Sequence, residues 1–170
     1  LYIVSKGIVV FFSGFIVVFL PLLLHQLLWV VALPIYTPSE VIDGTPVYDK
    51  FFLTKFYFEE LHQFNPYLHN LLYILLDSLF GGAIAVFSYA ISFIKNVNKY
   101  IILILPTVLF FSQNFLFALL GMANYSLSYY LYATTGINGL DYRMFIFSIT
   151  ILLIVSLFII FLSYKLEKDE

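Results

Sequence analysis

The sequence contains no cysteine and few charged residues, and these two absences narrow the class of protein. Without cysteine the chain forms no disulfide and offers no thiolate ligand for a metal ion. Charged residues make up 11% of the 170 residues, whereas a typical soluble domain has roughly 25%. The net charge is −2, so the chain lacks the basic surface that binds nucleic acid, and we expect no nucleic-acid partner.

Hydrophobic residue types make up 62% of the chain, with 20 Phe and 14 Tyr. A soluble fold of this length could not bury so much apolar surface, so we expect a lipid bilayer around most of it. A membrane-spanning helix needs about 20 mainly apolar residues, and four stretches meet that need. They predict an all-α integral membrane protein with a single transmembrane domain. The predicted spans cover residues 7–33, 68–94, 101–120 and 144–163.

Several residues mark the predicted helix ends. Asn65 followed by Pro66 is typical of an N-cap and first helical position, and predicts the start of the second helix. Gly121 predicts the end of the third helix. Pro21 lies inside the first helix and is expected to kink it, because proline removes a backbone hydrogen bond and clashes with the preceding turn.

The lysines next to the spans predict the orientation. With four crossings, five lysines lie on one side of the membrane, which the positive-inside rule makes cytoplasmic. Both ends of this segment are then cytoplasmic, and the expected location is the cell membrane. The five are Lys6, Lys95, Lys99, Lys165 and Lys168.

Two segments are predicted on the outer side. Residues 34–65 form a long loop, whose first part (35–49) is rich in turn residues and is expected to be irregular. Its second part is aromatic and predicts a short helix in the headgroup layer. Residues 121–143 are too polar to span, and predict a re-entrant or interfacial hairpin.

Asp77 is the one acidic residue inside a predicted span, which makes it the first candidate for function, because a charge at that depth is costly. A hydrogen-bonded role inside the helix bundle and a role in a substrate path both remain open. Ser78, Gly81 and Gly82 share neighbouring faces of this helix, and such small residues allow a second helix to approach closely.

Two polar pairs lie in the other spans. His25 and Gln26 follow Pro21 by one turn and are expected to bond carbonyls freed by the kink or a neighbouring helix. Gln113 and Asn114 are expected to bond between helices. For both pairs, lining a polar pathway is the alternative.

No catalytic or metal-binding motif is present in the sequence. The nearest group is Glu59, Glu60, His62 and His69, whose spacing matches no zinc-binding pattern. There is also no phosphate-binding loop and no nucleophile elbow. We therefore expect no enzyme activity and no cofactor in this chain, with a membrane enzyme using these four residues as a minor alternative.

The segments PLLLHQLLWVVALP, LLDSLFGGA and IKNVNKYIILILP resemble the membrane (permease) subunits of type 2 ABC exporters of Gram-positive bacteria. The resemblance implies six spans with an outer hairpin before the last one. Since the chain begins with Leu1, the first two spans would then be missing, and residues 121–143 would be the hairpin. The long loop at 34–65 departs from the compact members of the family.

The resemblance also implies partners and a mechanism. ATP and Mg²⁺ would bind a separate cytoplasmic ABC ATPase subunit, and a second permease subunit would supply the other half of the translocation pathway. The substrate would be a peptide, a lipid or another amphipathic molecule. The alternative function is a non-transporting membrane subunit that provides immunity, sensing or a scaffold.

Overall fold

The computed structural model describes residues 2–32, 40–42, 45–47, 58, 61, 64–95, 97–122, 125–131 and 142–169. Among these residues, four helices are long and apolar enough to cross a membrane. They indicate a multi-pass membrane protein and confirm the predicted all-α class with four candidate spans. The four are α1 (Tyr2–Ala32), α3 (Pro66–Ile91), α4 (Lys99–Leu119) and α6 (Tyr142–Asp169), and a short helix α5 (Leu127–Tyr130) precedes α6.

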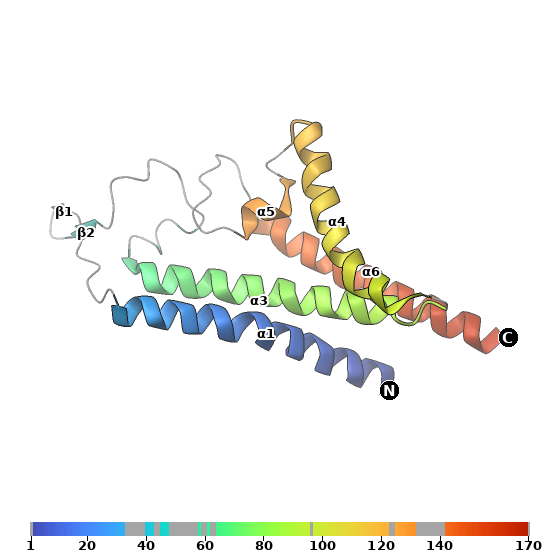
Figure 1. Cartoon of the computed structure of the whole chain (residues 1–170). Coiled ribbons are helices and arrows are strands. Elements are labelled where there is room, and N and C mark those ends of the chain that lie inside the picture. Colours follow the sequence, from blue (N-terminus) through green and yellow to red (C-terminus); the bar gives the residue numbers. More distant parts are fainter. Residues whose placement is uncertain are drawn as a thin grey trace.

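Helix α3 lies between α1 and α6 and packs against both (Figure 1). Helix α4 begins beside the end of α3 and then leans away from the other three (Figure 1). Both chain ends and the connection between α3 and α4 lie at one end of the molecule (Figure 1). The predicted lysine-bearing ends of the spans are therefore on one side.

The start of α3 follows the predicted capping chemistry. Asn65 has extended backbone angles, and its side-chain oxygen accepts hydrogen bonds from the amides of Tyr67 at 2.9 Å and Leu68 at 3.2 Å. Pro66 occupies the first helical position, where its missing N–H is not needed. The predicted start of this helix is confirmed.

The end of α4 is a Schellman motif at Gly121. The Gly121 amide donates to the carbonyl of Ala118 at 3.2 Å, and the Met122 amide donates to the carbonyl of Phe117 at 2.9 Å. Gly121 has φ +67°, which a residue with a Cβ rarely adopts. The predicted end of this helix is also confirmed.

Other helix bounds differ from the predicted spans. Helix α1 begins at Tyr2 and continues through Pro21 without a break. Helix α3 ends at Ile91, three residues before the predicted end at 94. There, the Ser92 hydroxyl donates to the Tyr89 carbonyl at 2.6 Å, and turns with hydrogen bonds between residues i and i−3 follow the helix. Hydrophobicity does not locate this end, because Phe93 and Ile94 in the turn are as apolar as the helix.

The expectation of an irregular segment at 35–49 is wrong in part. Strands β1 (Glu40–Ile42) and β2 (Thr45–Val47) form a two-stranded antiparallel sheet with Ile42 opposite Thr45. The sequence between the strands is Asp43–Gly44, a pair typical of two-residue hairpin connections. The sequence therefore contained a hairpin signal, which was missed because the many turn residues around it favoured an irregular loop.

Two other outer-side predictions fall largely outside the described residues. Most of the expected interfacial helix in 34–65 is not described. In the predicted hairpin 121–143, the structure describes residues 121–122, residues 125–131 with the short helix α5, and the start of α6, but not residues 123–124 or 132–141. The re-entrant or interfacial character of both segments stays a prediction.

Glycines bring α1 and α3 into close contact. A Cβ at Gly14 would lie 2.5 Å from the Ala85 Cβ and 3.0 Å from the Gly81 carbonyl oxygen. A Cβ at Gly82 would lie 2.9 Å from the Phe11 carbonyl oxygen. The two backbones therefore pack at a distance that only small residues permit, as in other membrane helix pairs.

An aromatic cluster joins α3 to α5 and α6. Phe80 of α3 and Tyr130 of α5 are each buried against Phe145 of α6, with ring centroids 6.0 and 6.1 Å from the Phe145 ring. Aromatic pairs at such separations attract beyond their buried area. The bundle is thus held by a glycine contact on one side of α3 and by stacked rings on another.

Candidate functional site

A polar cavity lies between α1 and α3, within the segments predicted to span the membrane. Its volume is about 330 Å³. Four of its lining residues come from α3 and three from α1, and Leu131, which follows α5, completes the wall. The lining residues are Leu22, His25, Gln26, Asn70, Tyr73, Ile74, Asp77 and Leu131.

Asp77 and Gln26 face one another's helices across this cavity. Gln26 donates from Nε2 to the carbonyl oxygen of Tyr67 at 3.0 Å, so α1 is tied to the first turn of α3. Its Oε1 atom is buried, as is the Oδ1 atom of Asp77, and neither has a hydrogen-bond partner among the described residues. The cavity therefore joins Asp77 to the pair His25 and Gln26, which lies in a different predicted span.

Ser78, Gly81 and Gly82 lie next to Asp77 but do not line this cavity. The Ser78 hydroxyl is fully buried and donates to the Ile74 carbonyl of its own helix. A Cβ at Gly81 would lie 2.5 Å from the Val18 side chain of α1, so Gly81 and Gly82 both face α1. Gly81 and Gly82 therefore contact α1, whereas Ser78 bonds its own helix.

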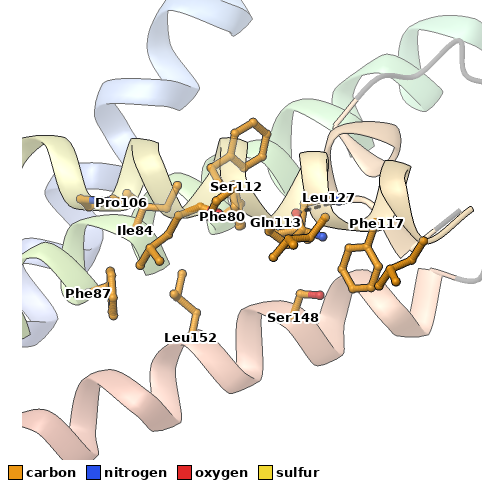
Figure 2. A pocket seen from close by; sticks show the side chains of 14 residues that line it. Phe80, Ile84, Phe87, Pro106, Ser112, Gln113, Phe117, Leu127, Ser148 and Leu152 are labelled. Carbon is orange, nitrogen blue, oxygen red and sulfur yellow. Dashed lines mark hydrogen bonds between the residues drawn. The ribbon is translucent and has the colours of Figure 1, made fainter. Parts of the chain in front are cut away.

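A second, apolar cavity of about 600 Å³ lies on another side of α3, between α4 and α6 (Figure 2). Phe80, Ile84 and Phe87 of α3 form one wall, and Leu152 of α6 another (Figure 2). Its few polar groups include Gln113 of α4 and Ser148 of α6. Such a lining suits an acyl chain or an apolar side chain.

Gln113 and Asn114 hold the α5 segment against α4. The Gln113 Nε2 atom donates to the Tyr125 carbonyl at 3.2 Å, and its Oε1 accepts from the Leu127 amide at 3.4 Å. The Asn114 Oδ1 atom accepts from the Ser126 hydroxyl and from the Ser128 amide at 3.3 Å. Both amides thus bond to the α5 segment, which follows α4 in the chain, and Gln113 also borders the apolar cavity.

The four residues considered for an outer enzyme site are not brought together by the described structure. Glu59, Glu60 and His62 lie outside the described residues. His69 is buried in α3 with its ring 5.0 Å from the ring of Tyr73. Within the described part of the chain, no three His, Cys, Asp or Glu residues are placed to hold a metal ion.

Sequence reasoning missed Asn70 and Tyr73 as members of the polar cavity. They precede Asp77 by seven and four residues, a spacing that puts all three on one face of a helix. The signal was therefore available in the sequence. Gly14 was also missed, although it lies seven residues after Gly7 and so on the same face of α1.

Comparison with known proteins gives no relative from which a function could be transferred: no family model, no curated protein and no solved structure matches this chain.

Proposed function

We propose that this chain is a permease subunit of an ATP-driven exporter and forms half of the pathway for an amphipathic substrate. The observation that carries the proposal is the apolar cavity between α4 and α6, which a membrane protein needs if it is to hold an apolar substrate within the bilayer. The resemblance of three sequence segments to exporter permeases supports the same function.

The packing of α4 is consistent with a pathway wall. All of α4 is described, and Pro106 is its one buried residue. Leu103, Phe111 and Phe115 are each at least 65% exposed, so much of this helix faces lipid or a second subunit. A second permease subunit packed against α4 would close the cavity and complete the pathway.

The lysine-bearing ends support the orientation that an exporter permease has. The Nζ atom of Lys6 lies 5.1 Å from the centroid of the Tyr2 ring, and that of Lys99 lies 5.4 Å from the centroid of the Tyr100 ring. Each ammonium is therefore beside an aromatic ring at a helix end. We propose that this end is cytoplasmic and contacts an ABC ATPase that binds ATP and Mg²⁺.

Cysteine labelling tests the orientation, because these 170 residues contain no cysteine. Lys95→Cys and Thr45→Cys are made separately and exposed to a membrane-impermeant maleimide in intact cells. Thr45→Cys is expected to react, whereas Lys95→Cys is expected to react only after the cells are opened. The reverse pattern would contradict the orientation.

Purification of the full-length protein in a mild detergent tests the transport function. We expect an ATPase subunit to copurify and the complex to hydrolyse ATP. Leu152→Trp, which fills the apolar cavity, is expected to abolish export while the subunits still assemble. Phe158→Trp is the matched control, because Phe158 is 59% exposed on the same helix and does not line the cavity.

Two results would contradict the proposal. One is an intact assembly without any nucleotide-binding subunit. The other is a complex that assembles and hydrolyses ATP but moves no substrate, and whose assembly and ATP hydrolysis are unchanged by Asp77→Asn. The second result is the one expected for a non-transporting subunit that provides immunity, sensing or a scaffold.

A further inference from the structure

The polar cavity between α1 and α3 has the composition of an amine site, and we propose that it binds a primary ammonium group carried on a short aliphatic chain. As a substrate subsite, this inference rests on the transport function proposed above and assigns cationic amphipathic molecules as its substrates. The binding itself is a property of this chain alone.

The first argument is the pair of unpartnered oxygens. Gln26 Oε1 and Asp77 Oδ1 are both buried acceptors without a partner among the described residues, and both side chains line the same cavity. A buried acceptor without a hydrogen bond costs about 1–3 kcal/mol, and more when it is charged. A ligand group that bonds either acceptor must therefore be a donor, and an ammonium group has three N–H donors.

The second argument is the charge of Asp77. A carboxylate at this depth is costly unless a cation is paired with it. Among the described residues that line the cavity there is no lysine or arginine, and His25 is the one basic side chain. An ammonium ligand would supply the missing positive charge. The ring of Tyr73 on the cavity wall adds an aromatic surface that attracts cations.

The third argument is the size and the apolar part of the cavity. A volume of about 330 Å³ is many times the roughly 15 Å³ that a single water needs by a comparable measure. Leu22, Ile74 and Leu131 supply aliphatic walls beside the polar groups. A bare metal ion would leave these walls uncovered, whereas an alkyl chain would contact them.

A primary ammonium in a membrane comes from two sources, the headgroup of an aminophospholipid or an amine in the transported molecule. Both present the same group to Asp77 and Gln26. The probe is therefore n-hexylammonium chloride, added to the full-length protein in nanodiscs of phosphatidylcholine, whose headgroup amine is fully methylated. The readout is the unfolding temperature as a function of probe concentration.

We expect a saturable rise in unfolding temperature with n-hexylammonium and none with 1-hexanol or hexanoate, which keep the chain but lack the positive charge. Asp77→Asn and Gln26→Leu are each expected to weaken the apparent affinity by roughly tenfold or more, since each removes a bond to a charged donor. Thr150→Val is the control, because its hydroxyl bonds its own helix away from the cavity.

Three results would overturn the proposal: no saturable shift, an equal shift with 1-hexanol, or an unchanged affinity in Asp77→Asn protein that unfolds at the wild-type temperature without ligand. A saturable shift with sodium chloride but not with n-hexylammonium would also overturn it, in favour of an inorganic cation. Nanodiscs that contain phosphatidylethanolamine identify the source, since loss of the n-hexylammonium shift there assigns the site to the lipid headgroup.

The two proposals fail separately. The binding measurement needs no ATPase, so absence of amine binding would leave the exporter function to be decided by copurification. Conversely, a chain that binds n-hexylammonium but purifies without an ATPase would keep the amine site and lose the transport function.

Discussion

The close contact between α1 and α3 makes a quantitative prediction at Gly14. In a Gly14→Ala variant the new Cβ would lie 2.5 Å from the Ala85 Cβ, 3.0 Å from the Gly81 carbonyl oxygen and 3.3 Å from the Gly82 Cα. All three neighbours are backbone atoms or a Cβ, so no side-chain rotation relieves the contact. The helices themselves must separate.

The expected cost follows from two opposing effects. Forcing an extra methyl group into a packed contact costs about 1–3 kcal/mol, whereas alanine favours a helix over glycine by about 0.5–1 kcal/mol. The overpacking effect is the larger, so Gly14→Ala is expected to destabilise the protein by about 1–2 kcal/mol.

Gly7→Ala is the matched control in the same helix. A Cβ at Gly7 would meet the Tyr89 ring at 3.8 Å, which is an ordinary van der Waals contact. Only the helix preference then remains, so this variant is expected to be neutral or more stable by up to about 1 kcal/mol. The same substitution thus changes sign within seven residues.

The assay is reversible unfolding of both variants in mixed micelles with increasing sodium dodecyl sulfate, followed by far-ultraviolet circular dichroism. The glycine contact predicts that Gly14→Ala unfolds at a lower detergent fraction than wild type and that Gly7→Ala does not. If Gly14→Ala is as stable as Gly7→Ala, the two helices do not pack through these glycines, and the polar cavity between them loses its basis.

Three further variants probe other parts of the structure. Asn65→Ala removes the cap of α3 and is expected to cost about 1 kcal/mol in the same unfolding assay. In Gly121→Ala the new Cβ would have no atom within 4 Å, so the expected loss of about 1–2 kcal/mol of stability comes from backbone strain alone. A Gly121→Ala variant more stable than wild type would contradict the left-handed conformation. Asn114→Leu breaks both bonds to Ser126 and Ser128, and is expected to increase protease cleavage around α5 without lowering the stability of α1 and α3.

The spanning helices and two of their ends were predictable because the cause is local. A segment that crosses the hydrocarbon must be a long apolar helix, so about 20 consecutive residues are enough to recognise it. The cap at Asn65 and the turn at Gly121 each depend on one residue and its neighbours in sequence. By contrast, α3 ends at Ile91 while apolar residues continue at Phe93 and Ile94, so hydropathy does not locate this end.

The polar cavity was not predictable as a unit, because it depends on which helices pack together. Asp77 was identified from its charge, and His25 and Gln26 from their polarity. Nothing in the sequence, however, showed that α1 packs beside α3 with these residues at the same height along the two helices. The contact at Gly14 sets this register, since it fixes how α1 is placed along α3. The sequence identifies most of the polar residues of the site, whereas the helix packing decides which of them share a cavity.

Helix α3 separates the two cavities, and the elements around it are held to different extents. On one side, the glycine contact joins α1 to α3, and the polar cavity lies between these two helices. On the other, α6 is fixed by Phe145, but α4 is buried only at Pro106 and tied at its far end to α5 through Gln113 and Asn114. Lipid solvates the apolar side chains of α4 as well as a packed neighbour would. Of the three long helices around α3, the one that packs least against it, α4, borders the apolar cavity.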